Sequence, residues 1–284
     1  MIHSPITKIL VDGRVFYVKR DDLIDPFLAG NKYRKLYKLL QTPSNKLSKI
    51  ISYGGTQSNA MLAIAAMCRL KRWEFVYYTK PLSKTQKDSS CGNYFNAVSL
   101  GMNHIEIDQK LYRDFIASLN LNIDEKTFLI EQGGAVSQAK EGLEQLADEI
   151  REENIGVKAL ATPSGTGTTA LFLALALPEF RVYTTPCVGD TDYLKQQMQV
   201  LHVLPENLII LEPLKKYHFA KPYSNFMQIY KKLLNSGIEF DMLYAPAMWE
   251  ALLCQTKDEI LYIHSGGVSG NESMLQRYAQ KGFA

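Results

Sequence analysis

A turn rich in glycine and hydroxyl side chains is the clearest chemical signal in the sequence. It follows the short apolar run 159–161 and reads Ser164, Gly165, Thr166, Gly167, Thr168, Thr169. Glycines let a ligand approach the backbone closely, and the unpaired N–H groups at the start of a following helix favour an anion. The turn lacks the lysine of a P-loop and does not match GxGxxG, which disfavours ATP and NAD. The composition predicts a phosphate-binding turn, although a tight turn with a Ser/Thr cap has a similar sequence.

A lysine at the start of a predicted helix is the second signal. Lys32 follows Gly30 and Asn31, and Lys35 and Lys38 come after it at intervals of three residues. Such spacing is typical of a solvated helix face. A cation at a helix start opposes the helix dipole, however, so position 32 favours an uncharged lysine, such as one held in an imine. Lys35 and Lys38 lie further along the helix and are expected to be surface charges.

Two further polar turns follow strand-like runs. Gln57, Ser58 and Asn59 come after the run 50–52, and Ser265 lies in the His264-to-Gly267 stretch that ends the run 260–263. Amide and hydroxyl side chains at a helix start are often only N-caps, and His264 is expected to be a packed or capping residue. The histidines are scattered, and the cysteines are widely spaced without metal-ligand spacing, so no metal site is predicted.

The elements that precede these turns must position them. Short β-rich runs alternate with helical segments whose apolar residues lie three and four apart. The runs with a strand pattern are 16–18, 50–52, 75–78, 104–107, 128–130, 159–161, 181–183, 208–211 and 260–263. This alternation predicts an α/β fold with mostly parallel sheets flanked by helices. Ligands in such folds bind beyond the carboxyl ends of strands, so the three turns suggest a single cleft.

Composition argues against several function classes. The 284 residues are 46% hydrophobic and 21% charged, which is the balance of a globular chain with a core. The net charge of +3 is weak and the lysines are dispersed, so no nucleic-acid partner is expected. No apolar stretch approaches the roughly 20 residues of a membrane span, and the N-terminus lacks the pattern of a signal peptide. We therefore expect a cytoplasmic protein with reduced cysteines and no membrane partner.

Taken in chain order, these motifs resemble the family of 1-aminocyclopropane-1-carboxylate (ACC) deaminase and D-cysteine desulfhydrase, pyridoxal 5'-phosphate (PLP) enzymes of the tryptophan synthase β-subunit fold. The matching residues are Lys19-Arg20-Asp21-Asp22-Leu23, Gly30-Asn31-Lys32, Arg34-Lys35-Leu36, Gln57-Ser58-Asn59, Ser164 to Thr169, Tyr244 with Met248, and Ile263-His264-Ser265-Gly266-Gly267. The resemblance implies the two-domain fold type II, with a smaller α/β domain at residues 38–136 inserted into a large PLP-binding domain of residues 1–37 plus 137–284. A homodimer is expected from the family alone.

The resemblance also implies a role for each matched residue. Lys32 would hold PLP as a Schiff base, and Asn59 would hydrogen-bond the ring hydroxyl. Ser58, between Gln57 and Asn59, would meet the substrate carboxylate or take part in proton transfer. Tyr244 would stack on the ring, and Tyr223 is the candidate for a second active-site tyrosine. The phosphate would be held by Ser164, Gly165, Thr166, Gly167 and Thr168.

The implied activity is that of a lyase or deaminase acting on a small amino acid. Lys32, freed by the substrate amine, would remove the Cα proton, and a Cβ leaving group such as sulfide would depart to leave a 2-oxo acid and ammonium. The family places a glutamate or a hydroxyl residue after the stacking tyrosine, where this chain has Ala245. We therefore expect D-cysteine desulfhydrase-like β-elimination rather than ACC opening, with Ser265 offering a hydroxyl to the pyridine nitrogen. ACC deamination, racemisation or β-replacement on the same fold, a PLP carrier without turnover and a plain nucleotide-binding module are the alternatives.

Overall fold

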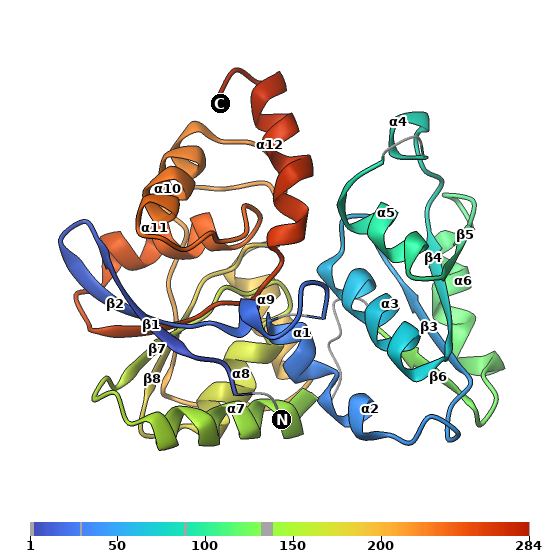
Figure 1. Cartoon of the computed structure of the whole chain (residues 1–284), viewed down its shortest axis with the longest axis horizontal. Coiled ribbons are helices and arrows are strands. Elements are labelled where there is room, and N and C mark those ends of the chain that lie inside the picture. Colours follow the sequence, from blue (N-terminus) through green and yellow to red (C-terminus); the bar gives the residue numbers. More distant parts are fainter. Residues whose placement is uncertain (1–2, 29, 88–89, 132–138, 284) are drawn as a thin grey trace.

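Two sheets, each flanked by helices, lie side by side in the molecule (Figure 1). The computed structural model describes residues 3–28, 30–87, 90–131 and 139–283. We call the part around the six-stranded sheet the large lobe and the part around the four-stranded sheet the small lobe. Strands of the small lobe come from residues 49–130, and those of the large lobe come from residues 6–19 and 159–263. The proposed domain boundary at 136/137 lies outside the described residues, and the division into domains stays a prediction.

The sheet of the large lobe has the strand order β1-β2-β10-β7-β8-β9. Its strands are β1 (Ile6–Val11), β2 (Arg14–Lys19), β7 (Ala159–Ala161), β8 (Arg181–Thr184), β9 (Leu208–Ile210) and β10 (Ile260–Ile263). All neighbours are parallel except β1 and β2, which form an antiparallel hairpin at the edge. The hairpin turn at Asp12 and Gly13 has φ values of 51° and 73°, which is the left-handed backbone that such turns require.

Helices cover both faces of this sheet because successive residues along each strand point to opposite sides. Leu160 and Leu261 pack under the helices α7 (Ala139–Glu153), α8 (Thr168–Ala176) and α9 (Thr191–Gln199). Ala161 and Tyr262 face the helices α10 (Ser224–Asn235), α11 (Ala245–Gln255) and α12 (Asn271–Gln280). The strands are thus buried on both sides, as parallel strands usually are.

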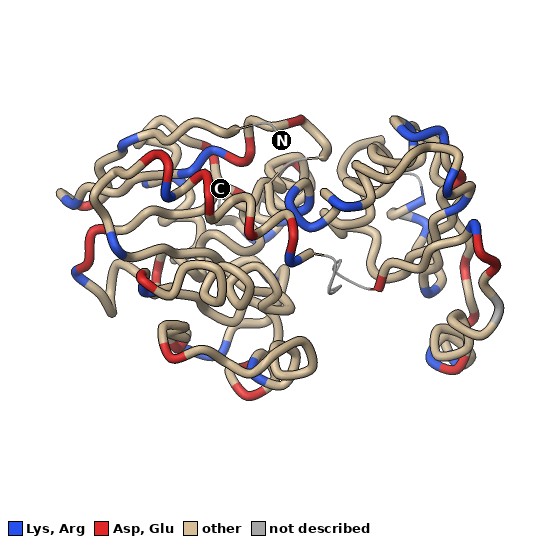
Figure 2. Tube along the Cα trace, turned by 90° about the horizontal axis from the view of Figure 1, so that it is seen from below, with Lys and Arg blue, Asp and Glu red and all other residues tan. Residues whose placement is uncertain are grey.

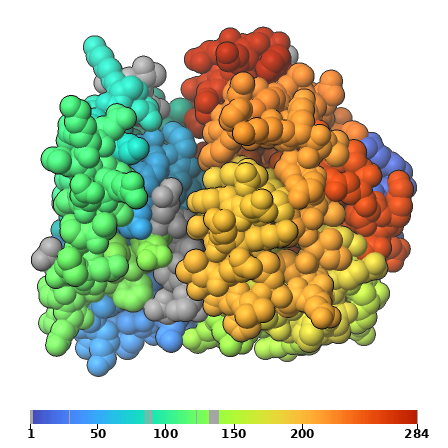
Figure 3. Space-filling view, turned by 180° about the vertical axis from the view of Figure 1, so that it is seen from behind, coloured from blue at the N-terminus to red at the C-terminus, as the bar shows by residue number. Residues whose placement is uncertain are grey.

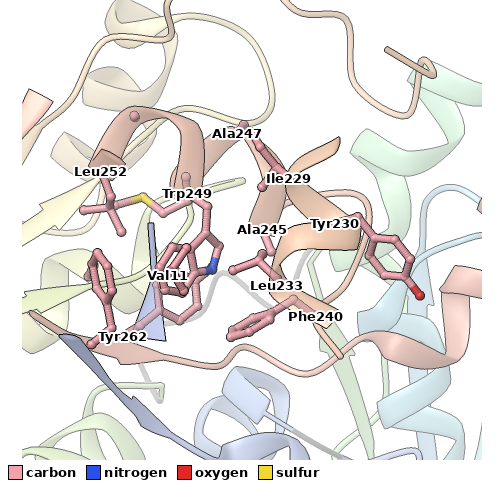
Figure 4. Packing of buried hydrophobic residues seen from close by; sticks show 14 of the residues in the cluster. Val11, Ile229, Tyr230, Leu233, Phe240, Ala245, Ala247, Trp249, Leu252 and Tyr262 are labelled. Atoms are coloured by element: carbon pink, nitrogen blue, oxygen red, sulfur yellow. The ribbon is translucent and has the colours of Figure 1, made fainter. Parts of the chain in front are cut away.

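An aromatic core fixes α11 on the sheet (Figure 4). Trp249 of α11 is fully buried and stacks on Tyr262 of β10, with ring centroids 4.8 Å apart. Phe16 of β2 and Phe240 meet the Trp249 ring edge-on at 4.8 and 5.5 Å. Because this packing holds α11 rigidly, it also fixes the position of Tyr244, the residue that precedes the helix.

The sheet of the small lobe is entirely parallel, with the order β5-β4-β3-β6. Its strands are β3 (Lys49–Tyr53), β4 (Glu74–Thr79), β5 (Met102–Glu106) and β6 (Thr127–Ile130). The helices α3 (Asn59–Lys71) and α5 (Gly92–Ser99) pack on one face, and α6 (Tyr112–Ser118) packs on the other. Short helices α1 (Gly30–Lys35) and α2 (Tyr37–Gln41) run between the lobes, and α4 (Lys84–Lys87) lies at the small lobe's edge (Figure 1).

The α/β class predicted from the alternating pattern is confirmed, and β7 and β10 have the predicted bounds. The prediction omitted β1. Acidic and basic residues are spread over both lobes (Figure 2), in keeping with the weak net charge. None of the helices in the described part of the chain is long and apolar enough to cross a bilayer.

Candidate active site

The helix that carries Lys32 contacts two of the predicted turns, the one after β10 and the one after β7. Gly30, at the start of α1, has φ +61°, and a Cβ added there would lie 2.0 Å from the carbonyl oxygen of Ser265. Only glycine permits this approach. The Asn31 amide donates to the Thr169 hydroxyl at 3.4 Å. α1 therefore joins the turn after β10 to the turn after β7, with Lys32 directly beyond the junction.

The Lys32 amine is in a setting that favours its neutral form. Burial lowers its pKa to about 8, although the nearby Asp241 carboxylate acts in the opposite direction. The amine donates to the Asn31 side-chain oxygen at 3.1 Å. A partly neutral amine at physiological pH is what a lysine needs in order to attack a carbonyl carbon.

The expectation that Lys35 is a surface charge was wrong. Lys35 is only 4% exposed, and burial together with the charge of Lys32 holds its pKa well below the ordinary value. The cause is that α1 packs closely on α7, since a Cβ at Gly142 would lie within 1.9 Å of the Arg34 carbonyl oxygen. Lys38 is exposed, as predicted.

A buried ionic network holds α1 in place. The Arg34 side chain is fully buried and donates to Asp21 at 2.8 and 3.0 Å and to Glu149 of α7 at 2.9 Å. Lys19, at the end of β2, lies 3.2 Å from the same Glu149 carboxylate. The network links β2, α1 and α7 two residues away from Lys32. Sequence reasoning noticed Lys19, Asp21 and Arg34 only as part of a motif, did not notice Glu149, and did not predict their pairing.

The turn after β7 has the backbone of an anion site. Gly167 precedes α8 with φ +77°, so the first N–H groups of α8 follow a left-handed residue. The Thr184 hydroxyl donates to the Thr162 carbonyl at 2.8 Å, so Ser164, 2.6 Å from Thr184, must donate its own hydrogen to that hydroxyl. The Ser164 side chain therefore braces the turn, the Thr166 and Thr168 hydroxyls lie 3.0 Å apart and hydrogen-bond each other, and the backbone N–H groups are the donors best placed to meet an anion.

Tyr244 lies over this turn. A Cβ at Gly165 would lie 3.4 Å from Cε1 of Tyr244, and the Phe219 ring packs 5.2 Å from the Tyr244 ring on another side. Burial raises the pKa of the Tyr244 hydroxyl well above its usual value, so the phenol stays protonated. The next residue, Ala245, is fully buried.

Asp241 is a site residue that sequence reasoning missed. Its carboxylate accepts the N–H groups of Leu243 and Tyr244 at 3.0 and 2.6 Å and thereby holds the turn that leads into α11. Burial raises the Asp241 pKa, while these N–H groups and His264 act against that shift.

The Gln57-Ser58-Asn59 turn approaches from the small lobe. Ser58 accepts the N–H of Met61 at 3.2 Å and so is the N-cap of α3, and its hydroxyl also hydrogen-bonds the Tyr77 side chain. Asn59 lies against the turn after β10, since a Cβ at Gly267 (φ +89°) would be 2.4 Å from the Asn59 amide nitrogen. Gln57 is exposed beside it.

Tyr223 and His264 make contacts that support the loops around the site. The Tyr223 hydroxyl accepts the N–H of His218 at 2.9 Å, and its ring packs on Tyr217, so it is linked to Tyr244 through the loop that carries Phe219. His264 is buried and stacks on Phe240, and its Nδ1 accepts the N–H of Gly266. It is the packed, turn-bracing residue that was predicted.

The structure therefore gathers the predicted motifs into one region. Gly30 meets Ser265, Asn31 meets Thr169, Gly165 meets Tyr244 and Gly267 meets Asn59. Glycines at positions 30 and 267 permit these close approaches, and the Lys32 amine and the Tyr244 ring lie in the same region. These features suit a flat anionic ligand with an electrophilic carbon. The roles of the individual residues remain predictions.

Solved structures with the same architecture define the class. An ACC deaminase homologue superposes with a TM-score of 0.78 at 21% identity, covering 98% of this chain and 94% of that one. A hydrogen sulfide-producing enzyme from Fusobacterium nucleatum gives 0.67 at 15% identity, with 94% and 96% covered. A pyridoxal 5'-phosphate-dependent aspartate racemase gives 0.66 at 12% identity, with 96% and 92% covered. The fold is that of the fold type II PLP enzymes.

Sequence relatives narrow the class. A Thermotoga maritima protein named "Putative 1-aminocyclopropane-1-carboxylate deaminase" is 26% identical over 91% of this chain and 90% of its own. The D-cysteine desulfhydrase of Serratia proteamaculans is 25% identical over 90% and 87%, and a bifunctional D-cysteine desulfhydrase/ACC deaminase of Arabidopsis thaliana is 24% identical over 92% and 74%. No family model matches the sequence. Over most of its length the chain is similar to proteins named ACC deaminase and D-cysteine desulfhydrase, which confirms the resemblance seen in its motifs.

Proposed function

We propose that this protein is a PLP-dependent lyase that acts on a small amino acid, most readily on D-cysteine. The observation that carries the proposal is the Lys32 amine, whose pKa is lowered to about 8, on a helix that contacts the glycine-rich turn after β7, over which the Tyr244 ring lies. The names of the relatives support the reaction class. We further propose that the enzyme is a cytoplasmic homodimer. Light scattering would measure its molecular mass in solution.

The site suits PLP in charge and shape. Phosphate oxygens would accept from the backbone N–H groups at the start of α8, and the ring would lie beneath Tyr244. Asn59 would donate to the ring oxygen, and Lys32 would be the covalent anchor. PLP, when bound, would withdraw electrons from the α-carbon of an attached amino acid.

The residues of the chain would supply binding and proton transfer. Ser58 and the free N–H groups near the start of α3 would hold the substrate carboxylate, and the freed Lys32 amine would take the proton from Cα. Loss of sulfide from Cβ and addition of water would then convert D-cysteine to pyruvate, hydrogen sulfide and ammonia. The neutral amine fraction that this step needs rises as the pH passes through about 8.

Ala245 favours D-cysteine over ACC. A cyclopropane has no ordinary leaving group, so opening it calls for a strongly electron-withdrawing, protonated pyridine ring, which a carboxylate beside the ring nitrogen would stabilise. Ala245 offers no such group. Sulfide leaves readily, so a neutral ring that accepts a hydrogen bond from Ser265 would suffice for D-cysteine.

Product assays test this assignment directly. We expect sulfide and pyruvate release from D-cysteine to exceed 2-oxobutyrate release from ACC, in a panel that includes L-cysteine, D-serine and L-serine. The Lys32→Ala variant serves as the negative control for product release. Faster release from ACC would overturn the substrate assignment. Cofactor absorbance with no product from any amino acid would instead indicate a PLP carrier.

The anion-binding turn yields a prediction of its own. Thr169→Ala removes one hydroxyl, and loss of a single hydrogen bond to a charged group costs about 1.5–3 kcal/mol. Gly165→Val blocks the approach to the backbone and intrudes on the Tyr244 ring, so we expect it to weaken PLP binding more. Fluorescence titration of the apoprotein gives both dissociation constants, with melting temperatures as the control for folding. Equal losses in the two variants would contradict binding through the backbone.

A further inference from the structure

The side chain of Asn93 makes a complete set of hydrogen bonds at the start of α5. It is fully buried. Its amide nitrogen donates to the backbone carbonyl oxygen of Gln57 at 3.1 Å and to the side-chain oxygen of Asn59 at 2.7 Å. Its oxygen accepts from the Ser269 hydroxyl at 3.0 Å. Both amide hydrogens and the carbonyl oxygen of Asn93 therefore have partners, and the side chain has a single favourable orientation.

This arrangement fixes the orientation of a second amide. The backbone carbonyl of Gln57 can only accept a hydrogen bond, so the atom of Asn93 that faces it must be the amide nitrogen. The same nitrogen also lies next to the Asn59 side chain. Asn59 consequently turns its oxygen toward Asn93 and its NH₂ group away from it. The NH₂ group lies beside Gly267, where an added Cβ would come within 2.4 Å of it. Asn59 thus presents a donor, not an acceptor, on the side of the turn after β10.

The same contacts tie the two lobes together. Asn59 and Asn93 belong to the small lobe, and Ser269 belongs to the segment between β10 and α12 in the large lobe. Ser273 of α12, whose hydroxyl donates to the Gly270 carbonyl at 3.0 Å, lies 3.4 Å from the Gln57 side-chain oxygen, next to Gly92. Figure 3 shows the furrow along which the lobes meet on the opposite side from Figure 1. The Ser269–Asn93 bond therefore joins the large lobe to the pair of amides that sets the donor face of Asn59.

We propose that Asn93 is a positioning residue that keeps the Asn59 amide turned with its N–H toward the ring oxygen of the cofactor, with Ser269 holding Asn93 in register across the lobes. The inference rests on the proposed PLP function. An anionic ring oxygen is stabilised by a donor and repelled by a carbonyl oxygen, so the orientation of the Asn59 amide determines whether this contact is favourable. A misoriented Asn59 would leave PLP bound but would make its ring oxygen more basic.

Asn93→Asp tests the relay because it keeps the shape and removes the donor. The carboxylate would draw the Asn59 NH₂ toward itself and turn the Asn59 oxygen to the cofactor. Absorbance against pH in the holoenzyme reports protonation of the Lys32–PLP linkage. We expect its midpoint to rise by about one pH unit or more, as loss of one charge-assisted hydrogen bond implies. Asn96→Asp places the same charge one turn along α5 and should leave the midpoint unchanged.

A double variant separates the relay from a general effect on folding. If Asn93 acts through Asn59, Asn93→Asp should not move the midpoint further once Asn59→Ala is present. An uncharged variant, Asn93→Ser, should raise the midpoint in the same direction and carries the test if Asn93→Asp does not fold. An unchanged midpoint in a folded Asn93 variant, or full additivity with Asn59→Ala, would overturn the inference. Absence of a PLP band in the unmodified protein would instead refute the proposed function itself.

Discussion

Lys32→Ala should lower turnover by more than about 10³-fold, because it removes the covalent anchor and the proton acceptor together. The phosphate contacts at the start of α8 remain in this variant, so the protein should still bind PLP non-covalently. Steady-state pyruvate release from D-cysteine measures the first effect, and equilibrium dialysis of PLP measures the second.

Lys35→Met is the matched control for this variant. Lys35 is also a buried lysine with a lowered pKa, three residues further along α1. Methionine fills similar space without an amine, so the variant should still hold PLP covalently. Retention of more than a tenth of the turnover in Lys32→Ala would contradict the role of Lys32. Loss of covalent PLP in Lys35→Met with Lys32 intact would move that role to Lys35.

Arg34→Met should destabilise the fold by about 3–5 kcal/mol, since removing one partner of a buried ion pair leaves the other charges uncompensated. Asp21 and Glu149, both buried, would lose their shared guanidinium. Urea unfolding at pH 7 gives the free energy of unfolding. Arg151→Met is the control, because Arg151 pairs with Glu179 at an exposed site where such a pair contributes less than about 1 kcal/mol.

The destabilisation caused by Arg34→Met should depend on pH, and the pKa of Glu149 gives the direction. Desolvation by itself would raise the Glu149 pKa, but hydrogen bonds and charge from Arg34 and Lys19 outweigh it and leave the pKa below its ordinary value. A carboxylate with a depressed folded pKa contributes stability above its unfolded pKa and loses it as the pH falls. The Arg34→Met penalty should therefore shrink as the pH falls below about 4.5, the ordinary pKa of a glutamate. A penalty below 1 kcal/mol at pH 7, or one that grows in acid, would contradict the network.

Local patterns in the sequence predicted much of the fold. β10 is a continuous apolar run and was predicted with its observed bounds, because a strand buried on both faces needs no alternation. β1 was omitted although Asp12-Gly13 is a strong hairpin signal between two alternating runs. That error came from the expectation of strand–helix alternation, which an edge hairpin does not follow.

The site was less predictable where distant parts of the chain meet. The Lys32 helix and the glycine turns were identified because each carries its signal within a few residues. Lys35 was misplaced because its burial depends on α7, more than a hundred residues away. Asn93 left no local signal at all, since its partners Asn59 and Ser269 lie 34 and 176 residues from it. Such contacts follow from the packing of the lobes and cannot be inferred from spacing.

Borohydride reduction of the PLP-loaded protein, followed by peptide mapping, tests the central claim most directly. Reduction converts a lysine–PLP imine to a stable amine, so the labelled peptide identifies the anchoring residue. The account predicts that the pyridoxyl label lies on Lys32 alone, with Lys35 and Lys38 unmodified. A label on Lys35 or Lys38, or a protein that binds no PLP covalently, would contradict it.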